Sequence, residues 1–389
     1  MENINDSTSD YMISSSCGNT SKWLDLRNVT TDIIDSNYFF SENEKFVILI
    51  FFPILMTFGT VGNVAFLVVV AKIPEMRTIT NTYLANLAVC DLLFIGTMVY
   101  DIFVAYLQSP DLKSIPVNTS LGCGTLYGVL YIAHFTSLCI VVLVSFERYL
   151  AICHPLQHRV VAAKGRTYKL LIAAWIFGIF YTGLIVPAFA QLQISCVLWP
   201  ESEKYNYAAT VLKHCTAVHP FFYSFAYIMQ TIPYITAVVF NSFVYYFIIN
   251  RMHHRKIEGA CNQTVREHKV ENARNQVAKL LIINGTAFFL CYLPYFTFRI
   301  NDAILSLSDG NFGFVFETEL HGVLQWVTRG LSTTNSVINP LIYSATNNRY
   351  RRAFIAVFMC RTNRKNEKMN SRGSSVSLSE AVNKCKKCG

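Results

Sequence analysis

The chain has 389 residues, of which 52% are hydrophobic and only 15% charged, and its mean hydropathy is +0.33. Soluble domains carry about 25% charged residues and disordered chains are poor in apolar ones, so this composition excludes both classes. The net charge of +9 would indicate a nucleic-acid-binding protein only if the basic residues gathered on one surface.

Seven long apolar runs are spaced along the chain, and each is long enough to cross a membrane as a tilted helix. In chain order they cover 46–71, 79–106, 122–146, 168–190, 219–249, 277–300 and 321–345. A large soluble helical protein is the alternative, but it would lack the polar surface needed to cover so many runs. An odd number of spans places the two chain ends on opposite sides of the membrane.

Basic residues indicate which side is which, because cytoplasmic loops carry an excess of Lys and Arg. The link 148–169, the loop 250–276 and the tail after residue 346 are rich in Lys and Arg, whereas residues 1–45 hold eight acidic and three basic residues. The sequence therefore predicts an extracellular N-terminus. The basic excess follows membrane topology and favours anionic lipids rather than nucleic acid.

Glycosylation sequons support the same orientation. They occur at Asn5, Asn19, Asn28 and Asn118, all on the predicted outer side, where we expect sugar to be added. A further sequon at Asn262 falls on the predicted cytoplasmic side and should not be glycosylated. The first 40 residues are polar and are expected to lack regular structure, and no apolar signal-peptide region precedes the first span.

Cysteines on the predicted outer side can form disulfides. Cys123 opens the third span and Cys196 lies in the 191–218 loop, so a Cys123–Cys196 bridge would tie that loop over the bundle. Cys17 and Cys215 could form a second bridge, although spacing alone does not fix the connectivity. Alternation in QLQIS, just before Cys196, predicts a hairpin strand. Cys360, after the last span, is a candidate for palmitoylation.

Polar residues at mid-membrane depth are costly and usually functional. They are one carboxylate, Asp91, with the amides and hydroxyl of Asn63, Ser137, Asn335 and Asn339. Such a group could hold a sodium ion or a proton. The alternative is a hydrogen-bonded network between helices that holds no ion.

Several short motifs follow one another in a fixed order. They are Gly62-Asn63, MRTITNTYLANLAVCDLL at 76–93, Cys123, SFERYLAICHPL at 145–156, Trp175, Pro233, CYLPY at 291–295, NSVINPLIY at 335–343 and NNRYRRAF at 347–354. Over residues 46–358 this set resembles the rhodopsin-like (class A) G-protein-coupled receptors. The resemblance implies an all-α membrane protein, a seven-helix bundle with a short amphipathic eighth helix, located in the plasma membrane. It implies no enzyme activity and no cofactor other than an allosteric sodium ion.

The resemblance also divides the chain and assigns roles. The regions are an extracellular glycosylated tail (1–45), the bundle (46–346), the membrane-surface helix (347–359) and a cytoplasmic tail (360–389). Asp91, Ser137, Asn335 and Asn339 match the sodium pocket. The residues matching the G-protein switch and the activation motif are Glu147, Arg148, Tyr149, Leu156, Tyr292, Asn339, Pro340 and Tyr343. Cys123 matches the extracellular disulfide partner.

The expected partners are a heterotrimeric G protein, membrane lipids, and arrestin and receptor kinases. The last two would act on tail serines, namely Ser371, Ser374, Ser375, Ser377 and Ser379. Calcium-linked (Gq-type) coupling is expected from the likeness alone.

Three positions depart from the family pattern. Tyr292 stands where the family usually has Trp, and Asn241 where helix five usually offers Tyr. Arg274 stands where some members place an acid against Arg148, so that salt bridge cannot form. The missing salt bridge predicts basal signalling above that of mock-transfected cells.

The residues expected to face the outer cavity combine aromatic walls with a few charges. They are Asp101, Gln108, Tyr127, Tyr131, His134, Tyr295, Phe296, Arg299, Trp326 and Arg329. Leu130 replaces the amine-binding acid and Thr333 the retinal lysine, which disfavours amine and light receptors.

The motif runs are most similar to neuropeptide receptors, with a likeness to the FMRFamide-type, ghrelin and neuromedin groups. The predicted ligand is an amidated peptide with a basic residue. The alternatives are a lipid or chemosensory ligand or, outside receptors, a transporter, which the absence of internal repeats disfavours.

Overall fold

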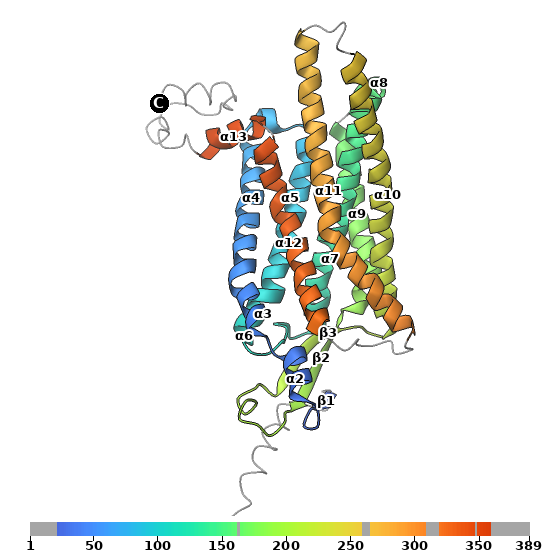
Figure 1. Cartoon of the computed structure of the whole chain (residues 1–389). Helices are drawn as coiled ribbons and strands as arrows, with labels where there is room; N and C mark the ends of the chain where they lie inside the picture. Colours follow the sequence, from blue (N-terminus) through green and yellow to red (C-terminus); the bar gives the residue numbers. More distant parts are fainter. Residues whose placement is uncertain (1–21, 162–163, 259–264, 309–318, 347, 359–389) are drawn as a thin grey trace, which may run out of the picture.

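The computed structural model describes residues 22–161, 164–258, 265–308, 319–346 and 348–358. Within these ranges, long helices run side by side as a bundle (Figure 1). A three-stranded sheet lies beyond one end of the bundle, and the short helices α8 (Pro155–Val161) and α13 (Asn348–Phe358) lie at the other end. α13 occupies the place where the short amphipathic eighth helix was expected.

The bundle helices coincide with the seven predicted spans. They are α4 (Phe52–Lys72), α5 (Ile79–Met98), α7 (Ser120–Cys153), α9 (Lys164–Ile185), α10 (Phe221–Glu258), α11 (Val265–Ser308) and α12 (Glu319–Thr346). Shorter helices extend or join them, namely α3 (Glu42–Phe46), η1 (Val47–Phe51), η2 (Pro74–Met76), η3 (Val99–Val104), α6 (Ala105–Gln108) and η4 (Val186–Ala188). α10 and α11 continue well into the basic 250–276 loop, beyond the predicted spans.

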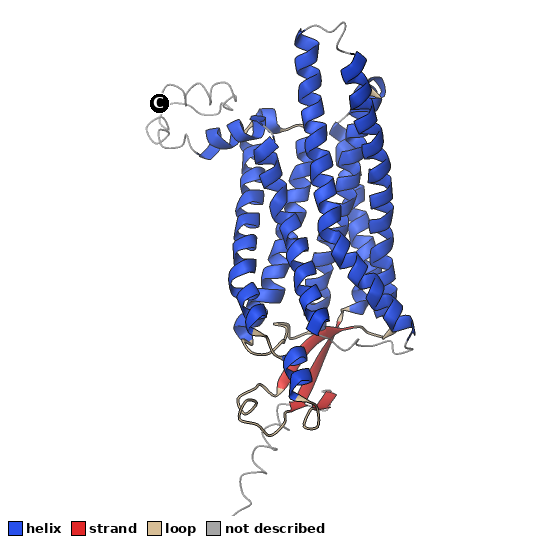
Figure 2. Ribbon diagram, in the orientation of Figure 1, coloured by secondary structure: helices blue, strands red, loops and turns tan. Residues whose placement is uncertain are grey.

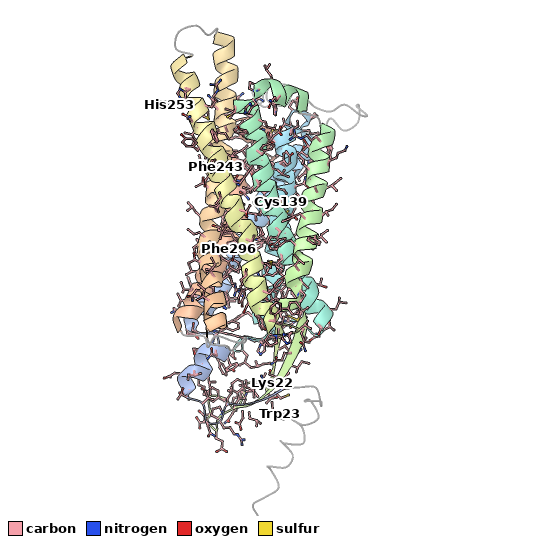
Figure 3. All side chains as sticks on the ribbon, turned by 90° about the vertical axis from the view of Figure 1, so that its right-hand side faces the viewer. Lys22, Trp23, Cys139, Phe243, His253 and Phe296 are labelled. Atoms are coloured by element: carbon pink, nitrogen blue, oxygen red, sulfur yellow. A yellow bond between two sulfur atoms is a disulfide. The ribbon has the colours of Figure 1, made fainter. Side chains whose placement is uncertain are left out.

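Apolar side chains cover the outside of the bundle, as a membrane protein requires. Phe58 on α4, Phe180 on α9 and Phe243 on α10 are 64%, 65% and 65% exposed, whereas Phe296 lies buried within the bundle (Figure 3). Among the described residues, six helices are long and apolar enough to cross a membrane by composition. α12 falls outside that set because the face it turns inward is polar, with Asn335 and Asn339 buried.

Close helix packing brings that polar face of α12 against α4. A Cβ atom at Gly62 would lie 3.1 Å from the ring of Pro340, so any other residue here would push the two helices slightly apart. The next residue, Asn63, is buried and donates from Nδ2 to the carbonyl oxygen of Ser336 at 2.8 Å. The hydrogen bond satisfies a buried amide and fixes α4 against α12 near the middle of the bundle.

The N-terminal segment is folded from residue 22 onward, contrary to the expectation of an unstructured tail. β1 (Lys22–Asp25) pairs in parallel with β2 (Gln191–Leu198), and β2 pairs antiparallel with β3 (Val211–Thr216) (Figure 2). Helix α2 (Thr31–Tyr38) packs beside this sheet. A separate apolar core holds the unit together, with Leu26, Ile34, Leu112, Val197, Tyr205 and Leu212 almost fully buried. No local sequence pattern predicts this core, because its residues come from three distant segments.

An ion pair closes the same unit from outside. Lys204 donates from Nζ to a carboxylate oxygen of Asp35, and the hydroxyl of Tyr205 donates to the other oxygen at 3.2 Å. The hydrogen bond to Asp35 raises the pKa of Lys204, which favours the charged form of this lysine. The hairpin loop is thereby attached to α2.

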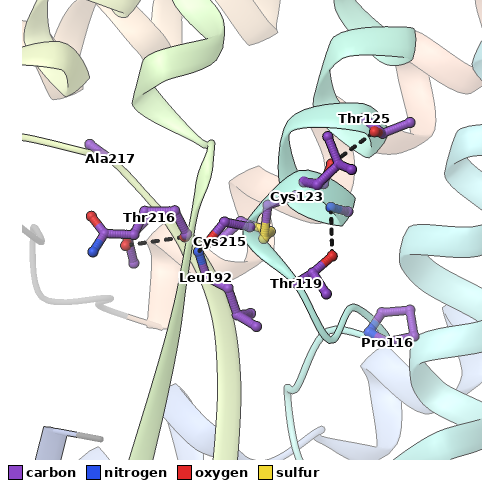
Figure 4. Close-up of a disulfide and its surroundings, with 12 residues drawn as sticks. Pro116, Thr119, Cys123, Thr125, Leu192, Cys215, Thr216 and Ala217 are labelled. Carbon is purple, nitrogen blue, oxygen red and sulfur yellow. Dashed lines mark hydrogen bonds between the residues drawn. A yellow bond between two sulfur atoms is a disulfide. The ribbon is translucent and has the colours of Figure 1, made fainter. Parts of the chain in front are cut away.

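The disulfide joins Cys123 to Cys215 and not to Cys196, so the predicted pairing was wrong (Figure 4). The strand register gives the reason: Cys215 is opposite Leu192, whereas Cys196 is opposite Val211, farther along the hairpin. Only the Cys215 end of β3 reaches the start of α7, where the two Cα atoms lie 5.6 Å apart. Cys196 is also disulfide-bonded. Cys17, once considered for Cys215, lies outside the described residues.

Candidate functional site

A chain of polar contacts crosses the end of the bundle that lies next to the sheet. Arg329 Nη1 on α12 lies 3.5 Å from Asp101 Oδ2 on η3, and the Arg329 guanidinium covers the ring of Trp326 at 5.7 Å. Trp326 Nε1 donates to Glu44 Oε1 at 2.7 Å, and Lys113 Nζ lies 3.0 Å from the same oxygen. Three of the predicted ligand residues, Asp101, Trp326 and Arg329, therefore belong to one network.

Glu44 and Lys113 were missed by the sequence analysis, although Glu44 carries a readable signal. Ser41 and Glu44 form a capping box at the start of α3, in which Ser41 N donates to Glu44 Oε2 at 2.7 Å. The S-x-x-E spacing before an apolar run marks such a helix start. What the pattern cannot reveal is that the other oxygen of Glu44 faces Trp326, on the last helix of the bundle.

Arg299 lies in an aromatic pocket made by α10 and α11. Its guanidinium sits 5.0 Å from the ring centre of Tyr227 and 5.2 Å from that of Tyr295. The hydroxyl of Tyr295 donates to Gln230 Oε1 at 2.8 Å. Tyr227 and Gln230 were missed because α10 carries no motif other than Pro233. Cation–π contacts of this kind hold a guanidinium in a fixed orientation at little solvation cost.

Beneath these groups the interior is closed by stacked rings. Tyr127 and Tyr131 both stack on Phe189, at 5.0 and 5.5 Å between ring centres. His134 meets Tyr292 at 4.7 Å, and Phe296 stacks on Tyr234 at 4.1 Å. The smaller Tyr292, in place of the usual Trp, therefore contacts His134 directly. Its ring also packs against Phe288 at 4.9 Å, which links this layer to the inner half of the bundle.

The charged groups form two separate sets. Asp101 pairs with Arg329, whereas Arg299 is held by the rings of Tyr227 and Tyr295. Gln108 lies apart from them. It borders an open groove of about 1900 Å³ lined by α2, α3, η1 and α12, and Trp326 forms part of the groove's wall.

Halfway along the bundle, Asp91 is completely enclosed. Its Oδ2 accepts a hydrogen bond from Asn339 Nδ2 at 2.8 Å, and Ser137 on α7 and Asn335 on α12 are buried as well. Asn335 Oδ1 is buried without a hydrogen-bond partner. One carboxylate with hydroxyl and amide oxygens suits a monovalent cation, because divalent ions usually take more carboxylates. The residues present therefore fit a sodium ion.

At the opposite end of the bundle, beside α8, Glu147 pairs with a residue outside its own helix. His158 Nε2 on α8 lies 2.7 Å from Glu147 Oε1, and the Glu147 side chain is buried. The neighbouring Arg148 is half-buried, with its Nε lacking a hydrogen-bond partner. Tyr149 bonds His154 at 3.1 Å between hydroxyl and Nε2. Leu156 is 77% exposed on α8, as a docking residue for a cytosolic protein would be.

A search of protein families finds one whose model covers most of this bundle. The family is described as "7 transmembrane receptor (rhodopsin family)", and its model matches residues 62–343. The chain belongs to the rhodopsin family of seven-transmembrane receptors. It is a receptor in the membrane and not an enzyme.

Curated relatives of this receptor carry names of peptide-hormone receptors. Neuromedin-U receptor 2 of Mus musculus is 26% identical over 307 residues, 78% of this chain and 73% of that protein. The thyrotropin-releasing hormone receptor of Homo sapiens is 26% identical over 337 residues, with coverage of 79% and 77%. Galanin receptor 2a of Danio rerio is 24% identical over 321 residues, with coverage of 82% and 79%.

The structure places two residues of the receptor's activation region, one that departs from the family pattern (Asn241) and one that matches it (Tyr343). Asn241 is buried on α10 and donates from Nδ2 to its own helix, to the carbonyl oxygen of Ala237 at 2.8 Å. Tyr343, after Pro340 on α12, packs on Phe66 with ring centres 5.2 Å apart. The side chain of Arg274, like Asn5, Asn19, Cys360 and the tail serines, lies outside those described.

Proposed function

We propose that this receptor binds an extracellular peptide and transmits binding to a heterotrimeric G protein. The observation that carries the proposal is the charged pair of Asp101 and Arg329, together with the Arg299 guanidinium held between aromatic rings, in the half of the bundle next to the sheet. A lipid ligand would favour an apolar cavity without enclosed charges. A transporter would require repeated halves or a second buried carboxylate to relay protons, and the sequence indicates neither.

The charges also favour a class of peptide. A C-terminal amide presents a carbonyl oxygen, which a guanidinium can bind by two hydrogen bonds, and Arg299 is held flat for this purpose by Tyr227 and Tyr295. Asp101 would take a basic side chain of the peptide, in competition with its present partner Arg329. We therefore propose a short amidated peptide with one basic residue.

Screening tests this proposal. Cells that express the receptor would be exposed to a library of short peptides, each in amidated and free-acid form, with calcium and cyclic-AMP readouts. We expect at least one amidated peptide to act at nanomolar concentration and its free acid to be much weaker. Activity confined to lipids, or equal potency of both peptide forms, would contradict the assignment.

The proposed orientation places the sheet outside the cell and α8 and α13 inside. Asn28 and Asn118 lie at the sheet end and are exposed, whereas the basic α13 lies at the opposite end. Epitope tags at the two chain ends give the test. Antibody should reach the N-terminal tag on intact cells and the C-terminal tag only after permeabilisation; both tags on the same side would exclude this topology.

A sodium ion bound by Asp91, Ser137 and Asn335 would stabilise the resting bundle. When sodium chloride replaces choline chloride in the buffer, we expect the wild-type receptor to show lower agonist affinity and lower basal nucleotide exchange. The expected change is about tenfold, the size of one charge-assisted contact. Asp91→Asn keeps the shape and removes the charge, so this variant should lose the sodium response. Retention of the sodium effect in Asp91→Asn would refute the site.

On the inner face, Glu147, Arg148, Tyr149 and Leu156 would meet the G protein once the inner end of α11 moves outward. Such a bundle has two discrete arrangements, and an agonist acts by preferring one of them. The proline positions in α11 and α12, Pro294 and Pro340, supply places where these helices can bend. Arrestin, receptor kinases and anionic lipids complete the proposed partners.

A further inference from the structure

A tyrosine hydroxyl lies between three helices in the inner half of the bundle. Tyr245, on α10, approaches Ser145 on α7 with 3.0 Å between the hydroxyl oxygens. Ser145 already donates its proton to the carbonyl oxygen of Val141 at 2.9 Å. A serine hydroxyl has a single proton, so Tyr245 is the donor and Ser145 Oγ the acceptor. The hydrogen bond therefore holds the tyrosine ring towards α7.

The backbone of the third helix, α11, lies close to the Tyr245 hydroxyl. Gly285 on α11 is buried, and a Cβ atom there would overlap the Tyr245 hydroxyl oxygen and lie 3.1 Å from Tyr245 Cζ. The backbone of α11 thus rests directly on the hydroxyl. Since packed interiors have no spare volume, any side chain at Gly285 must displace either the tyrosine or the helix.

We propose that Tyr245, Ser145 and Gly285 form a latch that holds α11 against α7 and α10 in the resting receptor. Tyr245 lies one turn beyond Asn241, the position where related receptors usually carry tyrosine. The latch replaces the salt bridge that Arg274 prevents. It rests on a neutral hydrogen bond, which shifts a two-state equilibrium by roughly two- to tenfold. The latch is therefore weak, consistent with the basal signalling predicted from the missing salt bridge.

Paired substitutions test the latch through ligand-free nucleotide exchange per surface receptor. Gly285→Ala should raise basal exchange about tenfold, because the new methyl group forces α11 outward.

Tyr245→Phe and Ser145→Ala should each raise basal exchange two- to fivefold. The two substitutions combined should raise it no further, because they remove the same hydrogen bond. In the double variant Tyr245→Phe with Gly285→Ala, the overlap with the hydroxyl oxygen is removed and only the 3.1 Å approach to the ring carbon remains, so basal exchange should fall most of the way back to the level of Tyr245→Phe alone. Gly183→Ala, whose Cβ would meet nothing within 4 Å, and Tyr246→Phe, which is 64% exposed, are matched controls expected to change nothing.

A second measurement separates the latch from the proposed G-protein coupling, on which the exchange readout rests. Spin labels at the exposed Gln157 and Lys279 report the spacing of α8 and α11 in purified receptor, without any G protein. Gly285→Ala should add a longer distance that Tyr245→Phe removes again.

A distance change without exchange on any G protein would overturn the coupling and leave the latch standing. Wild-type distances in Gly285→Ala, or a double variant as active as Gly285→Ala, would overturn the latch. If Gly285→Ala does not reach the cell surface, Tyr245→Phe and Ser145→Ala still test the latch. Basal exchange at the wild-type level in both variants would overturn the latch.

Discussion

Cys215→Ser should abolish the agonist response and lower surface expression at least tenfold. The Cys123–Cys215 bridge closes a sequence separation of 92 residues, and cross-linking a loop of that size is worth about 4–5 kcal/mol of unfolding free energy in the chain-entropy model. Without it, β3 loses its attachment to α7, and the sheet no longer stands over the cavity. Cell-surface immunolabelling together with agonist dose–response curves would measure both effects.

The pairing itself has a direct control. Cys123→Ser should match Cys215→Ser, and the double variant should be no worse, because both single changes remove the same bond. Mass spectrometry of unreduced peptide digests should recover the peptide of Cys123 joined to that of Cys215. Recovery of Cys123 joined to Cys196 instead would contradict the strand register described above.

Arg299→Ala is expected to lower agonist potency about 100-fold at unchanged surface expression. The substitution leaves the peptide's carbonyl without its charged donor, and hydrogen bonds to charged groups contribute up to about 3 kcal/mol. It also removes the cation–π contacts to Tyr227 and Tyr295. Radioligand competition and dose–response curves measure the loss of affinity and of potency separately.

Two variants on the same helix sharpen this test. Arg299→Lys keeps the charge but loses the planar fork, so an intermediate potency is expected. Thr297→Ala, on the exposed face of α11, should leave potency unchanged. If Arg299→Ala and Thr297→Ala behaved alike at equal surface expression, Arg299 would have no part in ligand binding.

The membrane spans could be predicted because lipid imposes long apolar runs that are visible in the sequence. The span that forms α12 was also predicted, although the polar residues on its inward face make the helix too polar to be recognised as a membrane span by composition alone. The polar residues at mid-depth, such as Asp91 and Asn339, were recognisable for the opposite reason: a charge or an amide is conspicuous in an apolar run.

Of the sheet unit, the QLQIS strand could be predicted and is confirmed as β2. The rest could not be predicted, because its contacts join segments far apart in the chain. The parallel pairing of β1 with β2 depends on a register that no local pattern specifies. The same register decides which cysteine reaches Cys123. Glu44 shows an intermediate case: the capping box is local and readable, whereas its bond to Trp326 spans 282 residues.

Nucleotide exchange in a purified system tests most directly whether the outer cavity drives the inner switch. The receptor in lipid nanodiscs would be combined with purified heterotrimeric G proteins of each class and with the amidated peptide found by screening. We expect the peptide to accelerate exchange at least tenfold on one class of G protein and to have no such effect with Arg299→Ala. Saturating peptide binding that leaves exchange at its basal rate on every class of G protein would contradict the account.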